Sequence, residues 1–287
     1  MPGRTRRLRV HRYRIPALFL ERARSFLVQA EAENGLILSI GGWGESATRP
    51  LNEQCYLATI EQSGNVVGCA VRTPPYGLNI TRAAPRALEV LLDDVAEKYD
   101  SLPSVLGPEP TSSAFAQLWS RRAGTRTRPI MRMRLFEARA VRPPEAPAPG
   151  ELRPAAEHDL RTVEEWAIAF HEEAGTGTPV DPVRGTREQV AEQRLFVWDH
   201  GGPVSMAVSG RRIERSVHIN IVYTPREYRR QGYASACVAA LTQQFLSSGV
   251  AFCCINADVT NPTTNKIYPA IGYRSVCELS NIDLNAG

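Results

Sequence analysis

Lysine is nearly missing from this 287-residue sequence, in which 32 of the 34 basic residues are arginine. Such a skew is typical of GC-rich genomes, so arginine abundance alone does not indicate nucleic-acid binding. The chain also lacks any run of about 18 uninterrupted apolar residues, which argues against a membrane-spanning helix. The apolar stretch 15–20 near the basic N-terminus is too short for a secretory signal.

The six cysteines form no CxxC pair and no spaced Cys/His set, which argues against a zinc site and a disulfide framework. Free cysteines are typical of a reducing compartment, so we expect a cytoplasmic protein without a bound metal and without a membrane partner. The sequence also lacks a Walker loop and a GxGxxG fingerprint, which disfavours P-loop nucleotide and dinucleotide binding.

Negative charge dominates most of the chain, although the formal net charge is +4. Residues 1–24 carry eight arginines and one glutamate, and residues 121–142 carry the same numbers. The remaining residues have 18 basic and 28 acidic side chains. The protein is therefore an acidic body with two arginine-rich segments, both in its N-terminal half.

A proline-rich stretch at 141–150 divides the sequence, with four prolines in ten residues. Proline lacks an amide donor and fixes its own φ, so this stretch suits neither a helix interior nor a central strand. We expect a semi-rigid linker at 142–150 between domains at 1–141 and 151–287.

The C-terminal domain shows hydrophobic patterns that alternate between helix and strand periods. They predict strand 151–154, helix 157–173, strands 194–198, 204–211 and 216–223, helix 233–247, strand 250–258, helix 263–271 and strand 273–284. This order indicates an α/β domain with a mixed sheet. The N-terminal half predicts a similar order, which suggests a divergent structural repeat. Its predicted elements are helix 16–34, strands 55–60 and 66–72, helices 85–99 and 113–122, and strand 126–136.

The segment Val222–Ala234 carries the clearest chemical signal. A predicted strand ends, a polar loop with Arg229 and Arg230 follows, and Gly232 opens a helix. Free N–H groups and the partial positive charge at a helix start favour an anion. The segment predicts a phosphate loop, with an exposed basic loop as the alternative. The N-terminal half has no counterpart of it.

The pattern Arg229-x-x-Gly232-x-Ala234 resembles the pyrophosphate loop of the GCN5-related N-acetyltransferases. A second stretch, Asn261 to Tyr268 followed by Gly272, is similar to the segment of that family beside the thiol of coenzyme A. The resemblance implies tandem acetyltransferase-like domains as in bacterial members, the N-terminal one degenerate and without a cofactor site. The degenerate domain would then be structural or form a wall of the acceptor pocket.

The resemblance also implies acetyl-CoA as co-substrate, held between two parallel strands that splay apart. A backbone N–H near the end of the strand 216–223 would polarise the thioester carbonyl. The cofactor-binding residues it implies are Val222, Tyr223, Thr224, Arg229, Arg230, Gln231, Gly232, Tyr233, Ala234, Ser235 and Asn261.

Tyr268 is the implied general acid for the departing thiolate, and packing against the sheet is its alternative role. Asn261 orients the thioester, caps the following helix, or does both. His218, on the strand leading to the site, is a candidate general base, although a lone strand histidine is more often only packed. Three carboxylates are candidates for acceptor binding, and they are Glu172, Glu173 and Asp258.

Three functions remain open from the sequence. The first is acetyl transfer from acetyl-CoA to a small-molecule amine. The second is an aminoacyl transferase of the same fold that takes its acyl group from aminoacyl-tRNA, which the arginine-rich segments favour because phosphate contacts drive RNA affinity. The third is a non-enzymatic regulator that binds coenzyme A or RNA.

Overall fold

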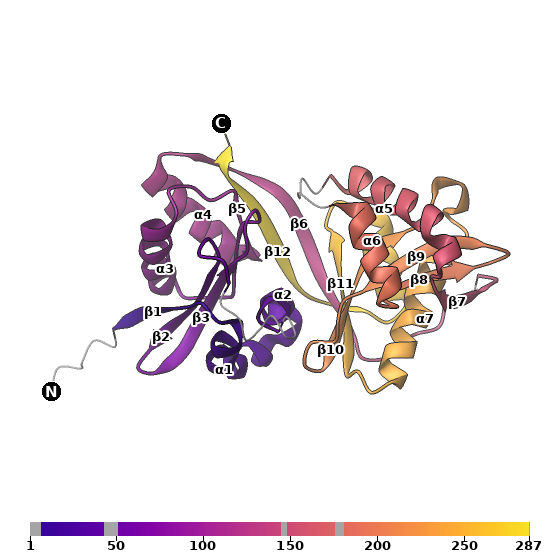
Figure 1. Ribbon diagram of the computed structural model, residues 1–287, viewed down its shortest axis with the longest axis horizontal. Coiled ribbons are helices and arrows are strands. Elements are labelled where there is room, and N and C mark those ends of the chain that lie inside the picture. The colour runs from indigo at the N-terminus through magenta and orange to yellow at the C-terminus, as the bar shows by residue number, and fades with distance from the viewer. Residues whose placement is uncertain (1–6, 43–50, 145–147, 176–180, 287) are drawn as a thin grey trace. The chain divides into compact units, whose positions relative to one another are not determined.

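The structure is a computed structural model that describes residues 7–42, 51–144, 148–175 and 181–286. The chain divides into two compact units. Unit 1 comprises Met1–Met133 and Cys277–Gly287, and unit 2 comprises Arg134–Val276. Figure 1 labels the helices and strands of both units.

The first half of the chain folds as strand, two helices, three strands, helix, strand, helix and strand. These elements are β1 (Leu8–Tyr13), α1 (Pro16–Leu27), α2 (Glu31–Gly41), β2 (Tyr56–Gln62), β3 (Asn65–Arg72), β4 (Leu78–Ile80), α3 (Pro85–Lys98), β5 (Ser104–Pro108), α4 (Glu109–Ala123) and β6 (Arg126–Ala138).

The second half repeats this order. Its elements are β7 (Glu151–Pro154), α5 (Leu160–Ala174), α6 (Pro182–Ala191), β8 (Leu195–Asp199), β9 (Pro203–Ser209), β10 (Ser216–Tyr223), α7 (Tyr233–Ser247), β11 (Phe252–Asp258), α8 (Pro262–Ala270) and β12 (Arg274–Ala286).

Strand pairing follows the same repeat. In unit 1 the order β1-β2-β3-β4-β5 is antiparallel except for the parallel pair β4–β5. In unit 2 the order β7-β8-β9-β10-β11 is antiparallel except for the parallel pair β10–β11. The structure therefore confirms a mixed α/β fold.

The last strand of each half of the chain pairs with strands that come from the other half. Strand β12 comes from the second half of the chain, yet it pairs antiparallel with β5 in unit 1, from Leu279 opposite Pro108 to Asp283 opposite Ser104. Strand β6 comes from the first half, yet it lies next to β11, and its residues 134–138 belong to unit 2.

This exchange differs from the predicted domains at 1–141 and 151–287. The linker at 142–150 separates the two repeats along the sequence, whereas the compact units divide inside β6 and inside β12. Proline content locates a loop, but the choice of neighbouring strand depends on packing between residues far apart in sequence.

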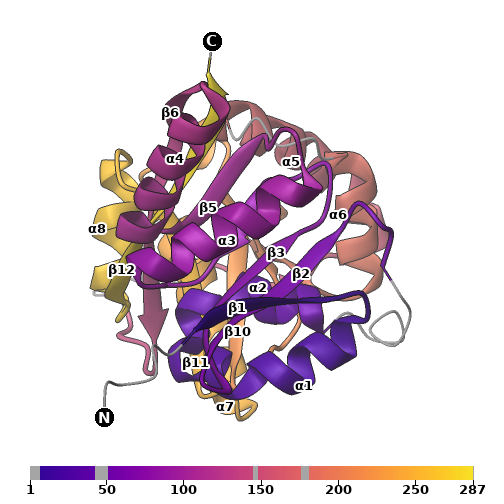
Figure 2. The same cartoon turned by 90° about the vertical axis from the view of Figure 1, so that its left-hand side faces the viewer.

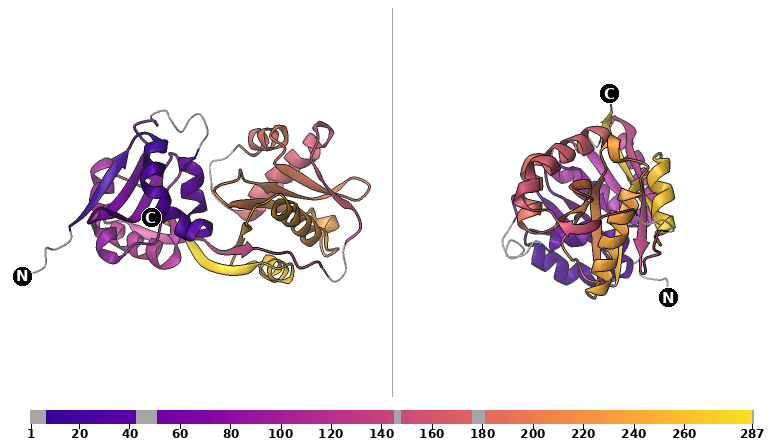
Figure 3. Two further views of the ribbon diagram at one scale, coloured as in Figure 1. Left: turned by 90° about the horizontal axis from the view of Figure 1, so that it is seen from below. Right: turned by 90° about the vertical axis from the view of Figure 1, so that its right-hand side faces the viewer.

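In unit 1, α3 and α4 pack together on one face of the sheet (Figure 2). Alternate residues of β2, such as Tyr56 and Ala58, point into this core, and α1 packs on β2 and β3 from the other face. In unit 2, α7 covers one face of the sheet, and α5 and α6 lie on the other (Figure 3, right).

Most predicted elements are present, with local differences. The helix predicted at 16–34 is broken by a 3-10 turn at Val28–Ala30, and α2 runs past Gly35 to Gly41. Gly35 does not end the helix as predicted, because it lies within α2, where it is buried. Four elements have no counterpart among the predicted ones, namely β1, β4, β5 and α6, and α2 was predicted only at its start.

Candidate functional site

Strands β10 and β11 diverge at their carboxyl ends. Their parallel pairing runs from Ser216 opposite Phe252 to Ile219 opposite Ile255 and ends there, although both strands continue. The pairing of β10 with β9 is irregular between Asn220 and Tyr223, where Ile221 has a φ of 46°. The edge of β10 beyond Ile219 is therefore open to an extended ligand, as in strand addition.

Helix α7 begins beside this opening with an uncapped N-terminus. Gly232 is the N-cap, with a φ of 83°, and no side chain bonds the helix start. The first helical bond is Ala236 N to Gly232 O, at 2.9 Å, which leaves the amides of the first turn without helical acceptors. No acidic residue lies in that turn, so the helix start favours an anion.

The loop before α7 is ordered by its own hydrogen bonds. Arg229 Nε donates to Thr224 O at 2.8 Å, and Gln231 Nε2 donates to Glu227 O at 3.1 Å. Arg230 has a φ of 65° and is exposed. Arg230 is thus within reach of solvent or a phosphate, as are the exposed parts of Arg226 and Arg229.

Arg229 and Glu173 form an ion pair with each other. The sequence predicted Arg229 in the cofactor site and Glu173 in the acceptor site. Arg229 Nη2 lies 2.8 Å from Glu173 Oε2 and 3.1 Å from Oε1. Glu173 Oε1 also lies 3.5 Å from the hydroxyl of Tyr223. Glu173 therefore holds α5 to the phosphate loop, and its role in binding the acceptor stays a prediction.

The side chains of the other predicted cofactor residues are largely engaged in the fold. The buried Tyr233 hydroxyl lies 2.8 Å from His200 Nδ1. Thr224 Oγ1 lies 2.8 Å from Ser205 Oγ, Val222 packs against the α7 core, and Tyr223 stacks at an angle with Trp166. These residues can thus serve a cofactor mainly through backbone groups, as can Ala234 and Ser235 at the start of α7.

Asn261 caps α8, as one of its two predicted roles requires. Its Oδ1 accepts hydrogen bonds from Thr263 N at 3.0 Å and Thr264 N at 3.3 Å. Asn265, which the sequence did not single out, donates from Nδ2 to Asp258 O and to Asn261 O, both at 2.7 Å. Asn265 therefore fixes the turn between β11 and α8, and its i+4 spacing from Asn261 was the available signal.

Tyr268 lies at the end of α8 nearest the core and is 2% exposed. Its ring meets Phe136 and Tyr273 at centroid distances of 6.0 and 5.9 Å. Burial raises the pKa of Tyr268, so the phenol stays protonated at neutral pH. The packing role is thus present, and a protonated phenol also suits the role of proton donor.

Asp258 lies beside Asn261, whose backbone N donates to Asp258 O at 3.1 Å, and Glu172 lies next to Glu173 near the end of α5. Asp258 Oδ1 accepts from Thr260 N at 2.8 Å and from Thr260 Oγ1 at 2.7 Å, so it closes a turn. Glu172 is exposed at the end of α5. The acceptor contacts of both residues stay predictions.

His218 lies in β10 on the face of the sheet opposite α7, because its neighbours Val217 and Ile219 point into the α7 core. Its Nε2 is buried and has no hydrogen-bond partner. Burial lowers the pKa of His218 to about 4, so the ring is neutral at pH 7. Burial raises the pKa of the thiols of Cys237 and Cys253 to about 12, which disfavours the reactive thiolate form.

Unit 1 lacks the equivalent anion site in its described residues. Only residues 81–84 connect β4 to α3, and Pro85 begins the helix, which removes one amide donor. Arg82 in this short connection pairs with Glu33 at 2.8 Å. The repeat in unit 1 thus has the same order of elements as unit 2, without a counterpart of the loop that precedes α7.

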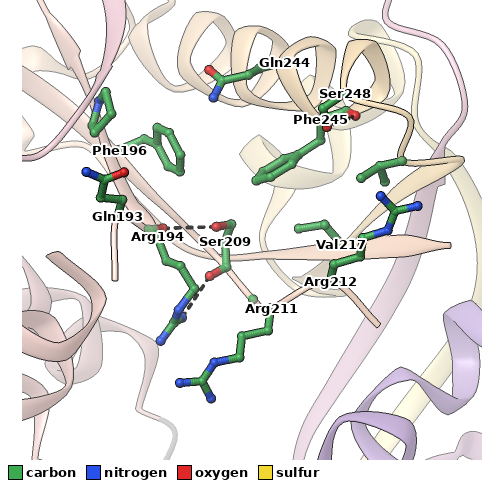
Figure 4. Close-up of a pocket in the computed structure, with 13 residues that line it drawn as sticks. Gln193, Arg194, Phe196, Ser209, Arg211, Arg212, Val217, Gln244, Phe245 and Ser248 are labelled. Carbon is green, nitrogen blue, oxygen red and sulfur yellow. Dashed lines mark hydrogen bonds between the residues drawn. The ribbon is translucent and has the colours of Figure 1, made fainter. Parts of the chain in front are cut away.

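A separate cavity of about 460 Å³ lies at the other end of α7 (Figure 4). Phe196 and Phe245 form part of its wall, and Arg194 beside it donates to Ser209 O at 3.0 Å. This cavity is distinct from the strand opening. In the described part of the chain, no cluster of three metal-ligating side chains is present, and no helix is long and apolar enough to cross a membrane.

Comparison with known proteins agrees with this geometry. Residues 160–273 match the model of the acetyltransferase (GNAT) family. No curated protein matches the sequence. Among solved structures, a GCN5-related N-acetyltransferase from Sphaerobacter thermophilus superposes with a TM-score of 0.60 at 16% identity, covering 98% of this chain and 96% of that one.

Two further structures show the same fold. A GNAT-family acetyltransferase from Colwellia psychrerythraea has a TM-score of 0.57 at 10% identity, covering 96% of this chain and 99% of that one. A tandem GNAT protein from the clavulanic acid biosynthesis pathway has a TM-score of 0.52 at 12% identity, covering 98% and 100%. Residues 160–273 therefore match the acetyltransferase (GNAT) family, and the chain shares the fold of these solved structures.

Proposed function

We propose that unit 2 transfers an acetyl group from acetyl-CoA to the amine of a small molecule. The observation that carries this proposal is the uncapped N-terminus of α7 beside the opening between β10 and β11. The pyrophosphate accepts hydrogen bonds from the amides around Gly232, and Arg230 adds positive charge. The pantetheine arm extends along the free edge of β10 at Val222–Thr224.

The reaction is a direct acyl transfer. The amine nitrogen attacks the thioester carbonyl carbon, the new C–N bond forms, and the C–S bond breaks. The departing thiolate takes the proton of the Tyr268 hydroxyl, and the nitrogen loses its extra proton to His218 or to solvent. A backbone N–H at the open edge of β10 polarises the carbonyl.

The contacts of the arginine-rich segments weaken the case for the tRNA-dependent alternative. Seven of these arginines lie in ion pairs with carboxylates of the chain. They are Arg12, Arg14, Arg22, Arg122, Arg128, Arg132 and Arg139. Pairing offsets the charge that an RNA backbone would need.

Thermal unfolding with acetyl-CoA, followed by detection of free thiol in the presence of amines, tests the proposal. We expect acetyl-CoA to raise the melting temperature and thiol release to depend on an amine. Binding without release under a broad amine panel would favour the non-enzymatic regulator. An effect of tRNA, with none of acetyl-CoA, would favour the aminoacyl transferase.

A further inference from the structure

The cavity of about 460 Å³ at the end of α7 lies wholly within unit 2, and the proposed acetyl transfer does not use it. It forms where α7 ends, at Phe245 and Ser248, and where β8 and β10 begin, at Phe196 and Val217. The opening between β10 and β11 lies at the opposite ends of β10 and α7. Since a helix of 15 residues is about 22 Å long, the two sites are well separated.

Aromatic and aliphatic side chains form the base of this cavity. Phe196 and Val217 belong to the α7 core, and Phe245 packs against that core. The rings of Phe196 and Phe245 lie 6.3 Å apart between centroids, at 80° to each other, and Figure 4 shows them facing one another. The cavity has the volume of a small-molecule site, and its base suits an aromatic ring.

Positive charge surrounds the cavity. Three arginines line it, namely Arg194, Arg211 and Arg212, and no carboxylate does. Arg194 and Arg211 share one counter-ion, because Glu192 accepts from Arg194 Nε at 2.7 Å and from Arg211 Nη2 at 2.6 Å. Among the described residues Arg212 forms no ion pair, and its Nη2 donates to Gly249 O at 3.2 Å. A guanidinium has five N–H donors, so Arg212 can donate further.

The end of α7 does not reverse this charge. The partial negative charge of a helix C-terminus favours a cation, and Arg212 already occupies that position. Carbonyls of the last turn have amide partners, with Ser248 N donating to Gln244 O and Gly249 N donating to Leu246 O, both at 3.1 Å. A cationic ligand would meet three arginines and no acidic side chain, so the cavity favours an anion.

We propose that this cavity binds a small aromatic carboxylate. The ring packs against Phe196 and Phe245, and the carboxylate accepts charge-assisted hydrogen bonds from the guanidinium of Arg212. A single guanidinium without a carboxylate partner suits a ligand charge of −1. None of the residues that line the cavity belongs to the predicted cofactor or acceptor site, so the ligand binds unit 2 independently of acetyl-CoA.

Three probes test this assignment by isothermal titration of the full-length protein at pH 7.5 and low ionic strength. They are 3-phenylpropionate, its neutral amide 3-phenylpropionamide, and propionate, which lacks the ring. We expect 3-phenylpropionate to bind with a Kd of about 1 mM, the amide to bind at least fivefold more weakly, and propionate to give no measurable heat. No binding of 3-phenylpropionate, or equal binding of acid and amide, overturns the inference.

Two adjacent glutamines of α7 locate the site. Both are exposed, but Gln244 lines the cavity, whereas Gln243 does not and bonds Ser247 Oγ at 3.0 Å. We expect Gln244→Trp to fill the cavity and raise the Kd for 3-phenylpropionate at least tenfold, and Gln243→Trp to leave it unchanged. Equal Kd values in the two variants overturn the inference.

Arg212→Gln tests the charge. We expect it to raise the Kd for 3-phenylpropionate at least fivefold and to leave the Kd for the amide unchanged. Arg161→Gln removes the same charge at an exposed position of α5 and should change neither Kd. An unchanged Kd for 3-phenylpropionate in Arg212→Gln overturns the inference.

Saturating acetyl-CoA separates this cavity from the anion site at the start of α7. We expect acetyl-CoA to change the Kd for 3-phenylpropionate less than twofold, because the two sites lie at opposite ends of the helix. Displacement of 3-phenylpropionate by acetyl-CoA would place the carboxylate at the start of α7 and overturn the inference.

Discussion

Arg229 on the phosphate loop donates to both carboxylate oxygens of Glu173 at the end of α5, at 2.8 and 3.1 Å. The pair joins the helix that covers one face of the sheet to the loop that precedes the helix on the other face. Its position couples the charge at the cofactor loop to the placement of α5.

Replacing Glu173 by glutamine removes a negative charge near the proposed position of the pyrophosphate. We expect Glu173→Gln to lower the Kd for acetyl-CoA about twofold to fivefold at low ionic strength, and salt to shrink this gain. Isothermal titration at two salt concentrations measures it. Glu164→Gln on the same helix breaks a pair with Arg187 and serves as control. Weaker binding in Glu173→Gln would show that the pair mainly orders the loop.

Gly232 begins α7 with a φ of 83°, a conformation that costs other residues about 1–2 kcal/mol. We expect Gly232→Ala to raise the Kd for acetyl-CoA at least tenfold, because the backbone must shift and a methyl group approaches the anion. Gly249→Ala is the matched control, since Gly249 has a φ of 85° and open space around it at the other end of α7. Equal effects of the two substitutions on the Kd would contradict the phosphate assignment.

Tyr268→Phe removes the proposed proton donor and keeps the packed ring. We expect kcat to fall at least tenfold, with the Kd for acetyl-CoA and the melting temperature nearly unchanged. Tyr273→Phe is the control, because this buried hydroxyl lies 2.7 Å from Thr242 Oγ1. The control should lose about 1 kcal/mol of stability and keep its turnover. Full turnover by Tyr268→Phe would refute the general-acid role.

Asp159 links β7 to the start of α5 and contributes to acid stability in unit 2. Burial raises its pKa, but hydrogen bonds from Arg153 and Ala156 N outweigh burial, and the net pKa lies below the ordinary 3.8. Since the folded pKa is depressed, the contribution is complete above pH 3.8 and is lost as pH falls through the folded pKa.

We therefore expect Asp159→Asn to lower the free energy of unfolding at pH 7 by about 3 kcal/mol, because Arg153 loses a buried partner. The variant should accordingly unfold at a lower denaturant concentration. The difference from the natural protein should shrink below pH 4 in urea titrations. Glu188→Gln, which breaks an exposed i,i+4 pair with Arg184, should cost under about 0.5 kcal/mol. A pH-independent difference for Asp159→Asn would contradict the linkage.

The loop and helix of the cofactor site were predictable from the sequence. Residues 222–234 contain strand end, polar loop, glycine and helix start in order, and α7 has the predicted bounds Tyr233–Ser247. Asn261 at the start of α8 and Tyr268 within it also follow from local spacing. Such features depend on neighbours along the chain, where turn chemistry and capping act directly.

Tertiary structure alone decided which partners the predicted residues meet. The pairing of Arg229 with Glu173, across 56 residues, has no local signature. The same holds for the exchange of β6 and β12. The sequence by itself determined the order of the elements and the phosphate loop, because hydrogen bonds and periodicity are local. Strand neighbours and buried faces were decided only on folding, because burial of apolar surface is non-directional and joins segments distant in sequence.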